Sequence, residues 1–199
     1  KELYAVSLNG KLRRLWQAPS DATLQDVLHA GRVLLDSDIT RQTVRVATLS
    51  DPVGEDYTVL SFSDNVNLSA DGRQAVIDEE SDSDTYVTYL RNVGSPQVIR
   101  LGDGSAVALS PDGQSALTTI PNQDRLQLQL LPTGPGSPRR LDTGNLVLLQ
   151  LAERFLPDGG ILFVASAPGQ RLRTYEYTPD GHVRPVSPPG VGGVWPTPD

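Results

Sequence analysis

The stretch Leu109-Ser-Pro-Asp-Gly113 decides the fold of this sequence, because close copies of it recur at a nearly fixed spacing. Aligned on their glycines, Leu68-Ser-Ala-Asp-Gly72 lies 41 residues earlier and Leu156-Pro-Asp-Gly159 lies 46 residues later. A degraded copy, Leu28-His-Ala-Gly31, precedes Gly72 by another 41 residues, and Pro196-Thr-Pro-Asp199 continues the series. A repeat of 20 to 50 residues is typical of arrays of small structural units.

Each copy predicts a tight turn between two short strands. The Asp-Gly pair supplies the positive backbone angles of a hairpin, and the flanking residues are apolar or β-branched. The most regular unit predicts four strands, at 65–69, 74–79, 86–91 and 97–101. Four strands in a period of about 41 residues are typical of a blade of a β-propeller. The sequence therefore predicts an all-β fold, a partial β-propeller.

The repeat divides the chain into about four complete four-stranded blades, with partial blades at both ends. The complete blades are expected at 21–64, 65–104, 105–147 and 148–190. Residues 1–20 are expected to be the outer strands of a preceding blade, and residues 191–199 the first strand of a following one.

One segment departs from the regular repeat. Residues 145–155 contain a dense run of leucines and a valine, which fits either a helical turn or the entry into a strand. We interpret this segment as an insertion that accounts for the longer step of 46 residues between Gly113 and Gly159.

Composition excludes several classes of function. The 199 residues include 17 Lys and Arg against 24 Asp and Glu, a net charge of -7. This charge repels phosphate backbones and anionic membranes, so we expect no nucleic-acid partner. No apolar run is long enough to span a bilayer, so no membrane-spanning segment is expected in this chain. The absence of cysteine excludes disulfides and thiolate chemistry, and it fits the cytoplasm and the periplasm equally well.

The repeat residues also carry a resemblance. The Leu-Ser-Pro-Asp-Gly motif and the hairpin Leu3-Tyr-Ala-Val-Ser-Leu-Asn-Gly10 resemble the TolB-like propeller repeats of bacteria, relatives of the WD-repeat family, over nearly the whole chain. The run from Gly104 to Gly113, with Leu130-Leu-Pro-Thr-Gly134 and Pro138-Arg-Arg-Leu141, is more narrowly similar to the C-terminal propeller of bacterial membrane-anchored serine/threonine protein kinases. The resemblance implies a sensory or protein-interaction module, outside the cytoplasmic membrane in the kinase case. The Trp-Asp dipeptide of WD repeats and all kinase motifs are absent, so kinase activity is not expected.

Catalytic residues are few. His29 and His182 are the only histidines, both lie in predicted turns, and no Gly-x-Ser-x-Gly elbow accompanies them. An active centre in a central pocket would need several carboxylates or histidines from inner strands, which offer mainly Asn67, Glu153 and Asp26. We therefore expect no catalytic residue and no enzyme. A small-ligand-binding or enzymatic propeller with a central pocket remains the alternative hypothesis.

Metal and cofactor sites are not expected either. The acidic run Asp78–Asp84, together with Asp36 and Asp38 one blade earlier, offers carboxylates of the kind that bind calcium. Its spacing does not fit a calcium loop, and we interpret it as a solvated loop. The glycines of 102–104 and 190–193 lack the Lys and Ser/Thr of a phosphate cradle and are interpreted as turns.

Aromatic and paired basic residues have structural interpretations. Four tyrosines in third strands are expected to pack between blades rather than to stack on a ligand: Tyr86, Tyr89, Tyr175 and Tyr177. The pairs Arg13-Arg14 and Arg139-Arg140 lie in outer strands, where charge blocks aggregation between sheet edges, and an interaction patch is the alternative.

The expected partial propeller has consequences for the partners of this chain. A propeller closes by placing its last blade beside its first, and four blades with two fragments need not close. We expect a protein partner, or self-association through the open terminal blades.

Overall fold

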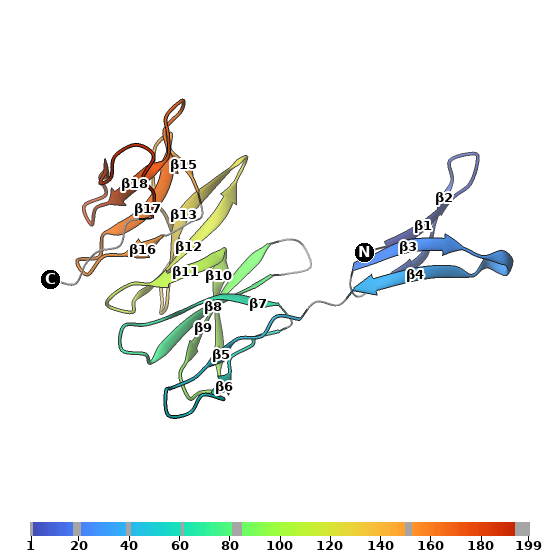
Figure 1. The fold of residues 1–199 in the computed structure, drawn as a ribbon, viewed down its shortest axis with the longest axis horizontal. Helices are drawn as coiled ribbons and strands as arrows, with labels where there is room; N and C mark the ends of the chain where they lie inside the picture. Colours follow the sequence, from blue (N-terminus) through green and yellow to red (C-terminus); the bar gives the residue numbers. More distant parts are fainter. Residues whose placement is uncertain are drawn as a thin grey trace. The chain divides into compact units, whose positions relative to one another are not determined.

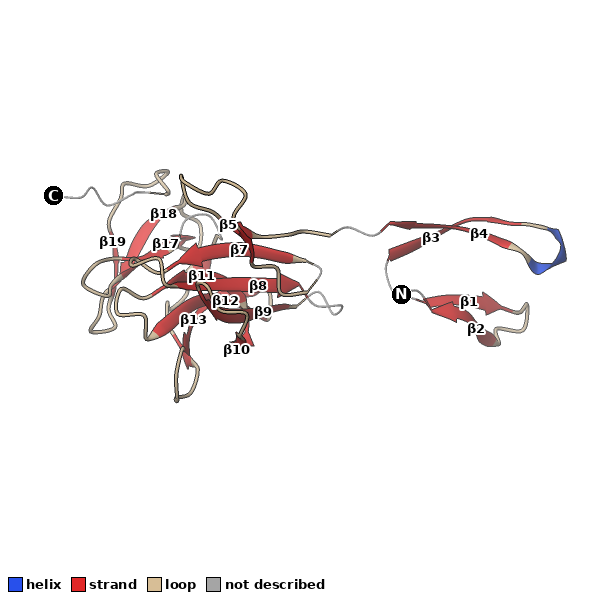
Figure 2. Cartoon of the chain, turned by 90° about the horizontal axis from the view of Figure 1, so that it is seen from below, coloured by secondary structure: helices blue, strands red, loops and turns tan. Residues whose placement is uncertain are grey.

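The computed structural model describes residues 2–17, 21–38, 41–60, 62–80, 85–149 and 153–193. These residues form 19 β-strands and one short 3-10 turn, η1 (His29–Gly31), which confirms the all-β fold (Figure 2). Among them, no helix is long and apolar enough to cross a membrane. The chain forms two compact units, residues 1–41 and residues 42–199, which are described separately.

Unit 1, residues 1–41, contains two antiparallel pairs of strands. Strand β1 (Glu2–Val6) pairs with β2 (Leu12–Gln17) through the turn at Asn9-Gly10. Strand β3 (Asp21–Val27) pairs with β4 (Val33–Asp38). None of the side chains described in this unit is buried.

Unit 2, residues 42–199, begins with the short pair β5 (Arg45–Val46) and β6 (Glu55–Asp56) and continues with three larger antiparallel sheets that follow one another in chain order (Figure 1). The first of these sheets contains β7 (Ser63–Leu68), β8 (Gln74–Glu80), β9 (Tyr86–Asn92) and β10 (Val98–Asp103). The second contains β11 (Ser105–Leu109), β12 (Ser115–Asn122), β13 (Arg125–Pro132) and β14 (Arg139–Arg140). The third contains β15 (Val147–Leu148), β16 (Arg154–Phe155), β17 (Ile161–Ser166), β18 (Arg173–Tyr177) and β19 (Val183–Pro185).

The three sheets of unit 2 lie within the blades expected at 65–104, 105–147 and 148–190, apart from one or two residues at their edges. Of the blade expected at 21–64, strands β3 and β4 pair with each other in unit 1, and β5 and β6 pair with each other in unit 2. Most of the strand expected at 191–199 lies outside the described residues.

The segment at 145–155 is an interrupted inner strand, and its described residues contain no helical turn. Both β15 and β16 pair with β17, so that Leu148 lies opposite Ala165 and Arg154 lies opposite Leu162. Between these two pairings the inner segment advances by six residues, from 148 to 154, whereas β17 advances by only three, from 162 to 165. The expected insertion lies between these two pairings and includes residues 150–152, which lie outside the described part.

The repeated turn has the same hydrogen bonds in successive sheets. The Ser110 hydroxyl donates to Asp112 Oδ1 at 2.5 Å and accepts the N–H of Ser115 at 2.9 Å. Ser69 and Asp71 repeat these contacts one sheet earlier. Only the glycine has a positive φ, +69° at Gly113, so the expectation that both residues of Asp-Gly would have positive angles was wrong. A four-residue loop built on a type I turn needs only its last residue to be left-handed.

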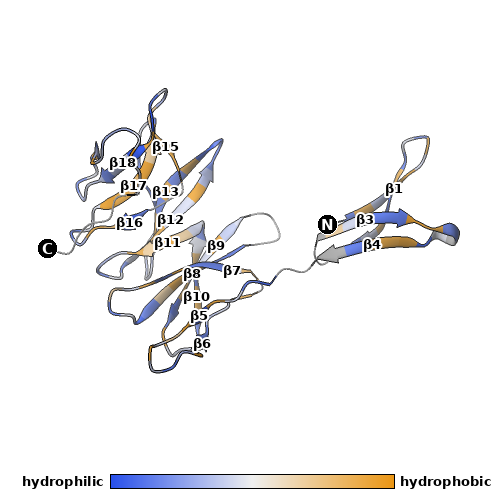
Figure 3. Cartoon of the chain, viewed as in Figure 1, coloured by the Kyte–Doolittle hydropathy of each residue, from blue (hydrophilic) through white to orange (hydrophobic). Residues whose placement is uncertain are grey.

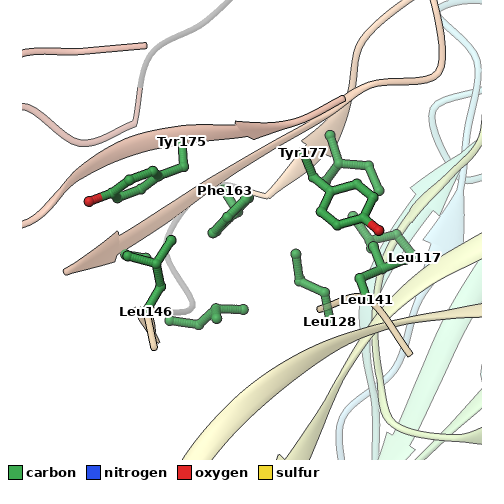
Figure 4. Close-up of a cluster of buried hydrophobic side chains, with 10 residues drawn as sticks. Leu117, Leu128, Leu141, Leu146, Phe163, Tyr175 and Tyr177 are labelled. Atoms are coloured by element: carbon green, nitrogen blue, oxygen red, sulfur yellow. The ribbon is translucent and has the colours of Figure 1, made fainter. Parts of the chain in front are cut away.

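The hydrophobic core lies between consecutive sheets. The largest cluster joins the second and third sheets around Leu117, Leu128 and Phe163, and Phe163 stacks on Tyr175 with ring centroids 5.8 Å apart (Figure 4). Two smaller clusters join the first sheet to its neighbours: Val76, Leu90, Ala106, Leu109, Ala116 and Leu131 on one side, and Tyr57, Ala75 and Ile77 on the other. The second strand of each sheet is thus covered on both faces, as packing of blades requires.

The left-handed conformation of the turn glycine can be tested by substitution. Gly72 has φ +68°, and a Cβ placed on it would meet no atom within 4 Å, so Gly72→Ala has only a conformational cost. We expect this substitution to lower the free energy of unfolding by about 1–2 kcal/mol. Gly134→Ala is the matched control, since that glycine also has open space but lacks a positive φ. Urea denaturation followed by circular dichroism measures both, and equal stabilities of the two variants would contradict the interpretation.

Candidate functional site

The two histidines are turn residues, as the sequence predicted. His29 lies in η1 of unit 1 and is exposed. His182 lies in a turn of unit 2, where its side chain is 80% exposed and its Nε2 lies 3.5 Å from Asp180 Oδ2. The main chain of His182 exchanges hydrogen bonds with the Thr178 hydroxyl, and the two histidines belong to different compact units. Their surroundings therefore resemble ordinary surface turns.

The polar residues of the inner strands do not assemble a centre. Asn67 is exposed on β7, Glu153 is half-buried beside β16, and Asp26 is exposed on β3 of unit 1. Asp26 Oδ1 accepts the N–H of the next residue at 2.7 Å. Within the described ranges, no group of three or more His, Cys, Asp or Glu side chains could hold a metal ion.

The acidic run beginning at Asp78 differs from the solvated loop that the sequence predicted. Asp78 and Glu79 are buried in β8, with 0% and 2% of their surfaces exposed, and Glu80 is half-buried. Residues 81–84 lie outside the described part, and Asp36 is exposed on β4 of unit 1. The first two acids thus belong to the interior of the first sheet, where each accepts several hydrogen bonds.

Asp78 connects the first sheet to the second. Its Oδ2 accepts hydrogen bonds from the Ser105 hydroxyl at 2.7 Å, the Ala106 N–H at 3.1 Å and the Asn65 side-chain amide at 3.1 Å. Ser105 and Ala106 begin β11 of the next sheet. The other carboxylate oxygen, Oδ1, is buried and has no hydrogen-bond partner among the described residues. Burial, only partly offset by these hydrogen bonds, raises the pKa of Asp78 above its ordinary value.

Glu79 holds the segment that precedes the first sheet. Its Oε1 accepts the N–H of Phe62 at 2.7 Å, and its Oε2 accepts the Ser63 hydroxyl at 2.6 Å and the Leu60 N–H at 3.3 Å. Three donors compensate a buried carboxylate, whose isolated burial would be costly. Glu79 therefore fixes the path of the chain into β7.

Arg91 connects the first sheet to the pair β5–β6. Its guanidinium lies 4.0 Å from the ring centroid of Tyr57, which is fully buried. It also donates to the main-chain oxygen of Asp56 at 2.8 Å and to Glu55 Oε1 at 3.2 Å. A desolvated cation over an aromatic ring, with its N–H groups bonded, is a strong contact. This buried arginine is a structural residue that the sequence analysis missed.

The remaining candidates are structural as well. Tyr175 and Tyr177 are buried in the largest core cluster, which confirms packing between sheets, while Tyr86 and Tyr89 are half-buried. The glycines at 102 and 104 permit close approach of the second sheet: a Cβ at Gly104, whose φ is +132°, would lie 2.9 Å from Ile120 Cγ2. Gly190 and Gly193 have positive φ and lie at a turn.

The strands of unit 1 present a different surface. β1 contains the consecutive apolar residues Leu3, Tyr4, Ala5 and Val6, and β4 begins with Val33-Leu34-Leu35 (Figure 3). In unit 2 the comparable run Ala75-Val76-Ile77 is fully buried, because sheets cover both of its faces. In unit 1, large apolar side chains are exposed instead: Tyr4, Val6, Leu8, Leu12, Leu15, Trp16, Leu24, Val27, Leu28, Val33 and Leu34. These exposed apolar side chains are a candidate interaction surface.

The pKa of Asp78 predicts how stability depends on pH. Because its pKa is raised in the folded chain, the folded state binds a proton at higher pH than the unfolded state does. Asp78 therefore makes the free energy of unfolding fall as pH rises from about 3.9 through the raised pKa. Asp78→Asn should remove this slope in urea titrations between about pH 4 and pH 7.

Asp112→Asn is the control with the opposite sign, because the Ser110 hydroxyl lowers the pKa of Asp112. That carboxylate stabilises the fold above its unfolded pKa, and this contribution is lost as pH falls. An unchanged pH slope in Asp78→Asn would contradict the interpretation of Asp78.

Comparison with known proteins rests on structure alone. No family model and no curated protein matches the sequence. Among solved structures, TolB from Acinetobacter baumannii superposes with a TM-score of 0.61 at 18% identity, covering 94% of this chain and 49% of TolB. A protein assigned as TolB from Agrobacterium tumefaciens gives 0.65 at 20% identity, covering 92% of this chain and 67% of that one.

A structure from a study of two prolyl endopeptidases gives a TM-score of 0.53 at 13% identity and covers 94% of this chain, but only 33% of that chain. The chain thus spans about half the length of the TolB from Acinetobacter baumannii and a third of the peptidase structure. Identities below 25% show the fold and not the activity. The narrower resemblance to kinase-linked propellers stays a prediction. By its sheets and by these superpositions, the chain has the fold of a partial β-propeller, similar to that of the TolB structures.

Proposed function

We propose that this chain is a non-catalytic protein-interaction module that forms part of a larger β-propeller protein. The observation that carries the proposal is the apolar surface of unit 1, whose strands have the sequence pattern of buried blades but are exposed. Covering one large apolar side chain contributes about 1.5–3 kcal/mol, so several of them together supply a strong driving force for association. We propose that another protein surface covers these strands. In a solution of the isolated chain, that surface belongs to a second copy of the chain.

The fold supports this proposal over an enzyme. The TolB structures share the propeller fold over nearly the whole chain, and the histidines His29 and His182 are exposed turn residues. The peptidase structure shares the fold at 13% identity over a third of its own length, which gives no reason to transfer its activity. The expected blade at 21–64 and the expected first strand of a following blade at 191–199 remain part of the proposal, as pieces completed by neighbouring sequence or by a partner.

The association is tested by light scattering coupled to size-exclusion chromatography. A single chain has a mass of 21.4 kDa, and we expect the native chain to elute at a multiple of that mass at micromolar concentrations. The double variant Leu12→Glu/Leu34→Glu places two charges on the exposed strands of unit 1 and should return the mass to that of one chain.

Leu49→Glu/Val53→Glu is the matched control, because these apolar residues are more exposed than Leu12 and Leu34 but lie in a loop of unit 2, and the double variant should leave the mass unchanged. The proposal would be contradicted by a native chain that elutes as a monomer and does not bind 8-anilinonaphthalene-1-sulfonate, a dye that binds exposed apolar surface. Its apolar strands would then be covered within a single chain.

A further inference from the structure

A groove separates the first and second sheets of unit 2. Its volume is about 680 Å³, within the range of about 300–1,000 Å³ that is usual for ligand sites. Its deepest residues are aliphatic, since Leu131 is fully buried and Ile120 nearly so, while Leu101 and Leu126 are half-buried. Its rim is basic, because Arg100 and Arg140 line the groove and are exposed. An aliphatic floor under a basic rim selects an amphipathic ligand.

The main chain of β10 forms one wall of this groove. β10 is the edge strand of its sheet and pairs with β9 alone. Gly102 lines the groove and has no side chain, so it contributes only main-chain atoms. A Cβ at this position would lie 3.0 Å from Leu131 Cδ2, so glycine is the residue that permits the close approach. An extended peptide can add to such an edge through main-chain hydrogen bonds.

The rim carries a net positive charge on an acidic chain. Arg100 forms an exposed ion pair of 2.5 Å with Asp103, and such pairs contribute little and leave guanidinium donors free to bind. Arg140 has no ion pair within the part of the chain that the structure describes. It lies directly across from Gln129, which also lines the groove and whose Nε2 donates to the Asp103 main-chain oxygen at 3.1 Å. A ligand carboxylate is the natural partner of Arg140.

We propose that this groove binds an extended protein segment in which an acidic side chain stands beside aliphatic ones. The inference rests on the proposed interaction function and names the chemistry of a partner at a second surface. The aliphatic side chains would cover Leu101 and Leu126, the carboxylate would bind Arg140, and the main chain would run along Gly102. The outermost strand β14 has only two residues, which leaves the groove open beside it.

The test uses a fluorescein-labelled peptide, Leu-Glu-Leu-Glu-Leu, and fluorescence anisotropy with the full chain. We expect saturable binding that Arg140→Gln weakens about tenfold or more, because a charge-assisted hydrogen bond is lost. Arg139→Gln is the matched control: it is equally exposed and adjacent, but it lies opposite Leu130 on the other face of the strand and does not line the groove. The peptide Leu-Gln-Leu-Gln-Leu should bind about tenfold more weakly to the native chain.

Absence of saturable binding up to about 1 mM peptide would overturn the inference. An equal effect of Arg139→Gln and Arg140→Gln would overturn it as well, since binding would then follow overall charge. The outcomes are separable from those of the association test. A chain that associates through unit 1 but binds no peptide refutes the groove alone, and a monomer that binds the peptide refutes the surface of unit 1 alone.

Discussion

Packing of apolar strands between two neighbouring sheets is the constraint on which unit 2 depends. Strand β12 shows it most clearly, because its residues 116–120 are buried in succession and do not alternate with exposed residues. A strand covered on one face would alternate apolar and polar residues, whereas a strand covered on both faces does not need to. Each sheet therefore requires a neighbour on either side. The polar contacts of Asp78, Glu79 and Arg91 lie at these same junctions.

The two ends of the chain meet this constraint differently. Near the C-terminal end, the turn at 187–193 folds back on the third sheet: the Val191 carbonyl accepts the N–H of Thr174, and a Cβ at Gly192 would lie 2.9 Å from Leu172 Cδ1. Glycine thus lets the chain lie close against its own sheet without displacing Leu172. In unit 1, none of the described apolar strands is covered in this way. Runs of apolar strand residues therefore form the core of unit 2 but are exposed in unit 1.

Much of the fold could be predicted because its signals are local. The turn at Ser110-Pro-Asp-Gly113 is specified by a hydroxyl, a carboxylate and a glycine within four residues, so its copies give the period and the strand order directly. The interrupted inner strand at 147–155 could not be predicted, because a run of leucines fits a helix and a strand equally well. The division of residues 21–64 between two units left no mark in the sequence either.

The polar junctions could not be predicted for a different reason. Glu79 was interpreted as part of a solvated acidic loop, yet two of its three donors are main-chain N–H groups at Leu60 and Phe62. Every residue except proline has a main-chain N–H, so the sequence does not show which of these groups will donate to a side chain. A signal was present nonetheless, since Asp78 and Glu79 directly continue the apolar run Ala75-Val76-Ile77. Acids that extend a buried strand without a turn are candidates for burial.

The buried carboxylate of Asp78 has a consequence for the docking of the first two sheets. An array of stacked sheets can in principle fold one unit at a time, each gaining only the contacts of its nearest neighbour. Asp78 links the first sheet to the second, because its donors Ser105 and Ala106 belong to β11. Docking of β11 buries the carboxylate and supplies these donors, which offset the burial only in part. Protonation of Asp78 therefore favours docking of the two sheets, and they separate more readily as pH rises.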